Sequence, residues 1–348
     1  MKILHIINDL SNNGGAQRFL VDLVVKHKPH YEVKILVLNK DNDFETQLNE
    51  NGVSFYYWPS LSIKEKWRLL RWPNLIHSHL FPSIYVALLA IGKKRVQTEH
   101  NTTNRRREYP ALKFMEYLMY QKHQKTICIT NKVREELVRF LPRYKDRYDV
   151  IYNGVDLNRF SRKAKSYSRI QPDSPINIGM AGRLHGYKDH PTLIKAIAKL
   201  PEHYHLHLAG DGDKKQQLQD LAQQLNCAHR VHWHGVISDV PTFLSNLDVY
   251  VQSSIIEGFG LAAVEAMAEG LPVLGSNVPG LDEVIGNDSY LFELGNEQEL
   301  ADKIEIICSS QAHYEMATQF FVERCKSFTL EQFRESYYKA YDELYASK

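Results

Sequence analysis

Short apolar runs alternate with amphipathic segments along the first half of the chain. Runs typical of buried strands lie at 2–8, 32–38, 53–58, 74–79, 95–99, 125–129 and 149–152. Segments with apolar residues at helical spacing separate them, at 44–51, 63–71, 81–91, 109–121 and 132–140. Because successive parallel strands need a long crossover, usually a helix, this alternation predicts a doubly wound parallel α/β sheet.

The alternation restarts after a polar, basic stretch at 157–175. Strand-like runs follow at 176–181, 204–209, 230–234, 249–252, 272–275 and 290–292, and a last helix rich in Tyr and Phe is expected at 330–345. We therefore expect two Rossmann-like domains, 1–172 and 173–328, that face each other across a cleft. Residues 329–348 should form a helix that crosses back onto the first domain. In such sheets, ligands bind beyond the carboxyl ends of the strands.

The stretch from Ser253 to Val273, SSIIEGFGLAAVEAMAEGLPV, predicts a strand end, a glycine loop, a helix and a second strand. Glu257 and Glu265 are separated by about two helical turns, so they should project from the same side. Glu257 also stands near the free N–H groups and the positive dipole end of the helix, which favours a polar, anionic ligand. Two glutamates at this spacing are usually a solvated face. The small apolar residues around them indicate instead a helix packed on a sheet.

Other strand ends of the second domain carry candidate ligand groups. Arg183 and Lys188 follow the strand 176–181, where two cations could neutralise a departing diphosphate in place of a metal ion; the alternative is an ordinary surface pair. Gly210 lies in the turn AGDGD, which we interpret as a tight turn against a nucleotide rather than a metal site. Ile237 follows the next strand and offers backbone groups to a base. The alternating histidines at 203–207 and 232–234 are expected to pack or face solvent.

The first domain offers two further candidates. Gly14 and Gly15 stand between a strand and a helix, the geometry in which backbone N–H groups receive phosphate, although Gly-Gly is also a common turn. His100 ends the strand 95–99, where an imidazole could donate a hydrogen bond to a substrate hydroxyl.

The two halves of the chain differ in net charge. Lys and Arg exceed Asp and Glu by 14 in residues 1–172, whereas Asp and Glu exceed Lys and Arg by 12 in residues 173–348. The basic half could meet nucleic acid or an anionic membrane. Two basic amphipathic segments, 63–72 with two tryptophans and 105–121 with Arg105, Arg106 and Arg107, are suited to a bilayer surface. A nucleic-acid-binding module is the remote alternative, because no helix-turn-helix, RNA-binding aromatic motif or zinc pattern is present.

The remaining features predict an ordinary cytoplasmic protein. No uninterrupted apolar run approaches the roughly 20 residues of a membrane span, and MKILHIINDL is typical of a strand rather than a signal peptide. The four cysteines have no metal-site spacing, so we expect them to be reduced and mostly buried.

Together, EGFGLAAVEAMAEGLPV, AGRL followed by Lys-Asp, AGDGD, the early NGGA loop, the Thr-x-His strand end and the NGVD link resemble the retaining glycosyltransferases of family 4, which have the GT-B fold. The resemblance spans nearly the whole chain, with the motifs in the expected order. It implies that Arg183 and Lys188 bind the diphosphate of a nucleotide sugar, with help from the backbone of Gly14 and Gly15. UDP is the expected carrier, and no metal or other cofactor is expected.

The resemblance also assigns the remaining positions. Glu265 would hold the ribose hydroxyls, Ile237 would frame the base, and His100 would lie near the reacting face of the sugar. Glu257 would contact the transferred sugar, together with the backbone of Phe259, Gly260 and Leu261. From the basic first domain we expect a lipid-linked saccharide acceptor in bacterial surface-glycan synthesis, with the protein peripheral at the inner face of the cell membrane. The alternative is the same fold acting on a small soluble acceptor.

Overall fold

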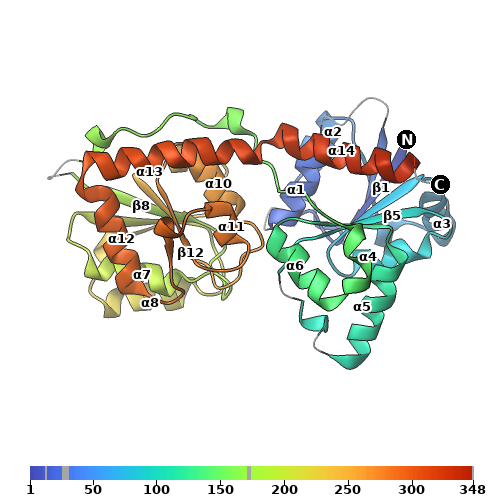
Figure 1. Ribbon diagram of the computed structural model, residues 1–348, viewed down its shortest axis with the longest axis horizontal. Helices are drawn as coiled ribbons and strands as arrows, with labels where there is room; N and C mark the ends of the chain where they lie inside the picture. Colours follow the sequence, from blue (N-terminus) through green and yellow to red (C-terminus); the bar gives the residue numbers. More distant parts are fainter. Residues whose placement is uncertain (12–13, 26–30, 103, 108, 171–173, 347–348) are drawn as a thin grey trace. The chain divides into compact units, whose positions relative to one another are not determined.

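The computed structural model describes the chain except for residues 12–13, 26–30, 103, 108, 171–173 and 347–348. It divides into two compact units, and each is described by itself (Figure 1). The first comprises Met1–Gly154 and Leu330–Lys348, and the second comprises Val155–Thr329.

The first unit is built on a seven-stranded parallel sheet with the order β3-β2-β1-β4-β5-β6-β7. Its strands are β1 (Lys2–Ile7), β2 (Glu32–Val37), β3 (Ser54–Tyr57), β4 (Leu75–His79), β5 (Lys94–Glu99), β6 (Lys125–Cys128) and β7 (Tyr148–Val150). Its helices are α1 (Gly15–Val24), α2 (Glu45–Glu50), α3 (Ile63–Arg71), α4 (Ser83–Val86), α5 (Pro110–Lys122), α6 (Asn131–Phe140) and α14 (Leu330–Ala346). The predicted parallel sheet is confirmed.

Both faces of this sheet are covered. Ile3 and Ile7 of β1 pack into a core that includes side chains of α1 and α14, whereas Leu4 and Ile6 point to the opposite face and pack with α3. Successive residues of a strand point to opposite faces, so a strand with two apolar faces must be covered on both.

One predicted helix is wrong. The segment 81–91 forms only the short α4 and a 3-10 turn at Ala87–Leu89. The Arg95 guanidinium of β5 donates to the carbonyl oxygens of Ala87 and Ala90. These carbonyls are therefore satisfied by a side chain rather than by a continuing helix.

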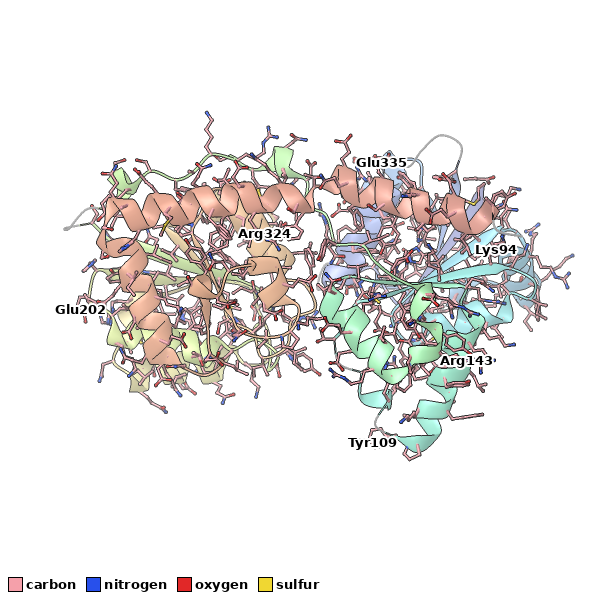
Figure 2. The ribbon with its side chains drawn as sticks, in the orientation of Figure 1. Lys94, Tyr109, Arg143, Glu202, Arg324 and Glu335 are labelled. Atoms are coloured by element: carbon pink, nitrogen blue, oxygen red, sulfur yellow. The ribbon has the colours of Figure 1, made fainter. Side chains whose placement is uncertain are left out.

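The C-terminal helix α14 belongs to the first unit. The hydroxyls of Tyr341 and Tyr337 reach His77 of β4 and Thr98 of β5, at 2.7 and 3.1 Å. Lys94, at the start of β5, donates to the carbonyl of Leu344 in the last turn of the helix (Figure 2). Aromatic residues at helical spacing thus bury one face of α14 against the sheet.

The second unit has a six-stranded parallel sheet with the order β10-β9-β8-β11-β12-β13. Its strands are β8 (Ile176–Ala181), β9 (Tyr204–Ala209), β10 (Val231–Gly235), β11 (Val249–Gln252), β12 (Val273–Ser276) and β13 (Leu291–Phe292). Its helices are α7 (His190–Lys199), α8 (Lys215–Gln224), α9 (Val240–Ser245), α10 (Leu261–Ala268), α11 (Leu281–Ile285), α12 (Glu297–Ser309) and α13 (Gln311–Arg324). Here too the predicted strands are confirmed.

The segment after Gly154, which we assigned to the first domain, lies in the second unit instead. The backbone N–H of Val155 donates to the carbonyl of Phe328, and that of Arg162 donates to the carbonyl of Ala268 in α10. This polar stretch lacks helical or strand periodicity, so its attachment by single backbone hydrogen bonds was not visible in the sequence. Residues 171–173, at the predicted boundary, lie outside the described residues.

Candidate functional site

The loop between β11 and α10 is shaped by glycine. Gly260, the N-cap residue of α10, has φ +92°, and Gly280 has φ +95°. A Cβ on Gly280 would lie 2.7 Å from the carbonyl oxygens of Glu257 and Gly258, so only glycine allows this close approach. The predicted order of strand, glycine loop and helix is confirmed, and Glu257 lies in the loop just before α10.

Glu257 is held in a polar cluster beside this helix start. Its carboxylate forms an ion pair with the ammonium of Lys188, and both side chains are mostly buried. Gln252 and Ser254 donate to the same carboxylate oxygen, Oε2, at 3.2 and 3.3 Å. The structure therefore brings together two of the residues that the sequence predicted, and it adds Gln252 and Ser254.

The loops that follow β8 and β11 place Lys188 in this cluster. The Asp189 N–H donates to the carbonyl of Ser253, and the Ile255 N–H donates to the carbonyl of Tyr187, at 3.0 and 2.9 Å. The Lys188 side chain passes over Gly182, where a Cβ would lie 3.5 Å from the lysine Cε. Neighbouring parallel strands thus deliver the lysine and the glutamate to the same edge of the sheet.

Tyr250 is buried next to the site, and both glutamates affect the pKa of its hydroxyl. Its hydroxyl accepts from the Ala181 N–H at 3.2 Å and donates to Gln252 Oε1 at 2.9 Å. Burial raises the pKa of Tyr250, and the charges of Glu265 and Glu257 raise it further. Both carboxylates therefore act on this one phenol, Glu257 from the loop and Glu265 from α10.

The turns after β8, β9 and β10 are tied together. A Cβ on Gly210, which has φ +141°, would lie 2.0 Å from the carbonyl oxygen of Gly182. The Gly210 N–H donates to the Gly235 carbonyl at 2.7 Å. Arg183 leaves this junction as an exposed side chain after β8, and the partly buried Ile237 follows β10.

The remaining donor-loop residues lie around the start of α10. Phe259 is buried, with its ring 5.4 Å from that of Phe328, and Leu261 is the first residue of the helix. Gly260, the N-cap residue of α10, has no side chain that could accept a hydrogen bond from the first N–H groups of this helix.

Gly14, Gly15 and His100 lie in the first unit. Gly14 is the extended N-cap residue of α1 and Gly15 begins the helix, as the strand-turn-helix pattern predicts. Asn13 of the NGGA motif lies outside the described residues. His100 follows β5, its ring lies 4.9 Å from that of Phe19, and burial lowers its pKa to about 3. That His100 and the glycine turn meet the residues of the second unit stays a prediction.

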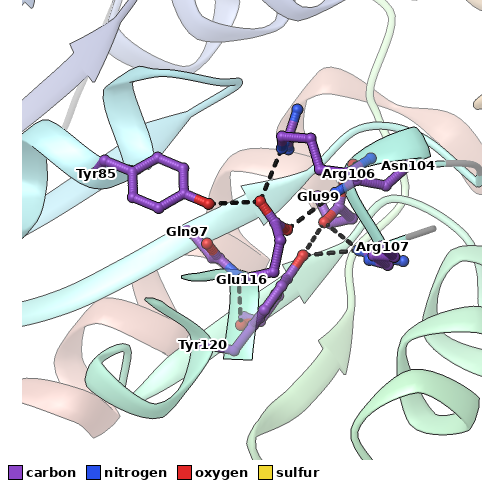
Figure 3. A network of polar contacts seen from close by, with 9 residues as sticks. Tyr85, Gln97, Glu99, Asn104, Arg106, Arg107, Glu116 and Tyr120 are labelled. Atoms are coloured by element: carbon purple, nitrogen blue, oxygen red, sulfur yellow. Dashed lines mark hydrogen bonds and ion pairs between the residues drawn. The ribbon is translucent and has the colours of Figure 1, made fainter. Parts of the chain in front are cut away.

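Two arginines of the arginine-rich segment in the first unit form ion pairs. Figure 3 shows Arg106 donating to Glu116 and Arg107 donating to Glu99. Glu116 is fully buried and also accepts from Tyr85 at 2.8 Å. Arg106 and Arg107 are therefore paired with carboxylates of the same unit, and binding of the segment 105–121 to a bilayer surface stays a prediction. The side chain of Arg105 lies outside the description.

Together, the second unit places a lysine, two carboxylates, hydroxyl and amide donors and a helix N-terminus at one edge of a parallel sheet. This combination is suited to a ligand that carries both an anionic group and hydroxyls. Two open parallel α/β sheets in one chain, with such a site in the second, define the GT-B class of glycosyltransferases.

Comparison with protein families agrees with this class. The model of the Glycosyltransferase Family 4 matches residues 13–159, and that of the Glycosyl transferases group 1 matches residues 162–320. Together the two models cover almost the whole chain. The chain therefore belongs to the glycosyltransferases of the family 4 type, which have the GT-B fold.

Two relatives that align with most of this chain are named as glycosyltransferases. The lipopolysaccharide core biosynthesis glycosyltransferase LpsD of Rhizobium meliloti is 28% identical over 87% of this chain and 87% of its own length. The N-acetylgalactosamine-N,N'-diacetylbacillosaminyl-diphospho-undecaprenol 4-alpha-N-acetylgalactosaminyltransferase of Campylobacter jejuni is 25% identical over 83% of this chain and 85% of its own length. Among other curated relatives, the chain spans 48% of the length of one glycosyltransferase and 62% of another.

The fold has solved counterparts. The crystal structure of Anabaena Alr3699/HepE in complex with UDP-glucose superposes with a TM-score of 0.85, at 21% identity, over 99% of this chain and 100% of that one. This likeness confirms the two-domain GT-B fold.

Proposed function

We propose that this chain is a retaining glycosyltransferase that moves a sugar from a UDP-sugar to a lipid-linked saccharide in bacterial surface-glycan synthesis. The observation that carries the donor half of this proposal is the cluster of Lys188, Glu257 and Ser254 beside the start of α10. A UDP-glucose complex of a protein with the same fold supports the choice of carrier.

In the donor complex, Lys188 and Arg183 bind the diphosphate, and the backbone of Gly14 and Gly15 assists them. These cations stabilise the charge that develops as the sugar–phosphate bond breaks, so the diphosphate needs no metal ion. The N–H groups at the start of α10 add the positive end of a helix dipole. Glu265 accepts hydrogen bonds from the ribose hydroxyls, and Ile237 and the turn at Gly210 border the base.

Glu257 binds the sugar itself. Its carboxylate is neutralised by Lys188, with Gln252 and Ser254 as further donors. When a diphosphate attracts Lys188, the carboxylate becomes available to accept from sugar hydroxyls, beside the backbone of Phe259, Gly260 and Leu261. Binding of the anionic carrier thereby prepares the site for the sugar.

The transfer proceeds with retention of the anomeric configuration. The acceptor hydroxyl attacks from the side of the leaving group through an oxocarbenium-like state, and the departing diphosphate takes the proton. No covalent glycosyl-enzyme forms, unlike in the retaining hydrolases with two closely spaced carboxylates. His100, whose low pKa keeps its imidazole neutral at pH 7, donates a hydrogen bond to the sugar near its reacting face.

The acceptor proposal depends on the surface of α5. Phe114, Met115 and Leu118 are 40% to 62% exposed on this helix, with Lys113 and Lys122 exposed between and beyond them. Tyr109 stands at the outer end of α5 (Figure 2). An exposed apolar helix face flanked by lysines is suited to insertion at an anionic bilayer surface. Among the described helices, none is long and apolar enough to cross a membrane.

Donor screening tests the enzymatic half. The purified chain, in EDTA, is incubated with UDP- and GDP-sugars while slow hydrolysis and the unfolding midpoint are followed. A UDP-sugar should be hydrolysed and should raise the midpoint. Absence of both effects with every nucleotide sugar would contradict the proposal.

Vesicle flotation tests the membrane half. Phe114→Asp should reduce binding to vesicles that contain anionic lipid, because it places a charge on the exposed apolar face. Asn49→Asp on α2, also an exposed position, adds the same single negative charge and is the matched control. Indifference of the wild-type chain to anionic lipid, with full activity on a water-soluble acceptor, would favour the soluble-acceptor alternative.

A further inference from the structure

Three histidines meet in the interior of the first unit. His5 of β1 lies in register with His77 of β4, and His79 follows two residues later on the same face. One ring nitrogen of each lies within 4.8 Å of those of the other two, and all three side chains are almost completely buried. The cluster arises because adjacent parallel strands place alternate residues on one face.

The spacing of the nitrogens matches a metal site. His5 Nδ1 and His79 Nε2 share a hydrogen bond of 3.2 Å, and this distance is close to the roughly 3.3 Å that separates two nitrogen ligands on a tetrahedral zinc ion, so an ion could replace the shared proton. Three imidazoles gathered at this spacing offer the nitrogen ligands that zinc takes in proteins.

Surrounding hydroxyls can orient the ligands. His77 contacts Tyr341 through Nδ1 and Thr98 through Nε2, at 2.7 and 2.8 Å. If one of these nitrogens binds a metal, the hydroxyl on the other still fixes the ring, as outer partners do for metal-bound histidines. The Nδ1 atom of His79 is buried without a hydrogen-bond partner among the described residues, so this nitrogen is open to a ligand.

We propose that His5, His77 and His79 form a binding site for one divalent transition-metal ion, with Zn²⁺ as the best fit. Three histidines are a known zinc ligand set that leaves a fourth position for water or a hydroxyl. The ion links β1 to β4 and fixes His79, whose ring lies 5.8 Å from that of His100. It lies in the first unit and takes no part in binding the diphosphate through Lys188.

A second histidine group provides the control. His207 and His234, on β9 and β10 of the second unit, approach to 3.0 Å, but their partly exposed or exposed position makes them an adventitious metal-binding surface. Any metal bound there must be distinguished from the buried site. The variant His234→Asn removes this pair without touching the first unit.

The test uses the full chain, stripped of metal by a chelator, and Co²⁺ as a spectroscopic probe. We expect one Co²⁺ per chain with the visible absorption of a four-coordinate ion, unchanged in His234→Asn and weakened at least tenfold in His79→Leu and in His5→Leu. Far-UV circular dichroism checks that the variants are folded. Absence of this absorption in the wild type, or its loss in His234→Asn alone, would overturn the proposal.

A second test of the metal site needs no substitution in the histidine cluster. One equivalent of Zn²⁺ should raise the unfolding midpoint of wild type and of His234→Asn, because an ion that binds only the folded state stabilises it. An unchanged midpoint in both would also overturn the site. Neither assay contains a nucleotide sugar, so its failure leaves the transferase proposal intact, and a failed donor screen leaves the metal site intact.

Discussion

Lys188 and Glu257 are 69 residues apart in the sequence, yet their side chains form an ion pair at the carboxyl edge of the second sheet. Ser254 contacts both partners, at 3.3 Å from each. A buried ion pair alone is weak support for stability, because desolvation opposes the attraction. An anionic ligand can instead separate this ion pair by attracting Lys188, so the pair can serve ligand binding.

The first prediction concerns Lys188. Lys188→Ala should lower turnover by about 10²- to 10³-fold, the usual effect of removing one group that stabilises transition-state charge. Gln252 and Ser254 still donate to Glu257 in this variant, so the fold should remain. Steady-state kinetics and circular dichroism measure the two effects. Lys199→Ala, an exposed lysine at the end of α7, is the control and should behave as wild type.

Glu265 should affect binding of the nucleotide more than turnover. Glu265→Gln keeps the shape of the side chain but replaces a charged acceptor of the ribose hydrogen bonds, each of which contributes about 1.5–3 kcal/mol. The Kd for free UDP should therefore rise by about tenfold or more. Glu257→Gln should not weaken UDP binding, because it removes the carboxylate that competes with the diphosphate for Lys188, and it should lower turnover, since Glu257 is assigned to the sugar. Isothermal titration with UDP distinguishes the two, and the reversed pattern would contradict their assignment.

Most of the fold could be predicted from periodicity. The strands at 176–181, 204–209 and 249–252 begin and end at the predicted residues, because apolar runs of buried strands are bounded by glycine or polar turns. The segment 81–91 could not be predicted, since Arg95 replaces its helical hydrogen bonds from another strand. A contact of this kind leaves no local pattern.

The candidate site was predictable where glycine and charge mark the ends of strands. Lys188 and Glu257 meet as neighbouring strand ends should. Gln252 and Ser254 were missed because their signal, two polar residues at the end of an apolar strand, resembles an ordinary turn. The histidines of β1 and β4 were also missed, because their proximity depends on strand order, which periodicity does not give.

Stability should fall in mild acid, in part through His123. Burial lowers the pKa of His123 to about 4, against 6.5 for a free histidine. Between these values the unfolded chain binds a proton that the folded chain does not, so stability decreases as pH falls below about 6.5. At pH 5 this one residue should cost about 2 kcal/mol.

Urea unfolding at pH 7 and pH 5 measures this loss. His123→Gln should show a smaller difference between the two pH values than wild type does. His313→Gln, an exposed position on α13, should keep the wild-type difference. An equal pH dependence in His123→Gln and wild type would show that His123 is not buried in its neutral form.

Glu116 should be important for the stability of the first unit. Its buried carboxylate accepts from Tyr85, Asn104 and Arg106 at 2.8 to 3.0 Å (Figure 3). Glu116→Leu leaves three donors without an acceptor and should lower the free energy of unfolding by about 3–5 kcal/mol. Glu135→Leu on α6 removes an exposed ion pair with Lys132 and should cost less than about 1 kcal/mol. Similar losses in the two variants would contradict the role of the buried carboxylate.

The central claim is that fixed positive groups of the chain, rather than a divalent ion, hold the diphosphate of the donor. Titration of UDP into wild type and Lys188→Ala, each in EDTA, tests it most directly. The account predicts that wild type binds UDP without metal and that Lys188→Ala binds it at least tenfold more weakly. Binding that requires added Mg²⁺ or Mn²⁺, or that is equal in the two proteins, would contradict it.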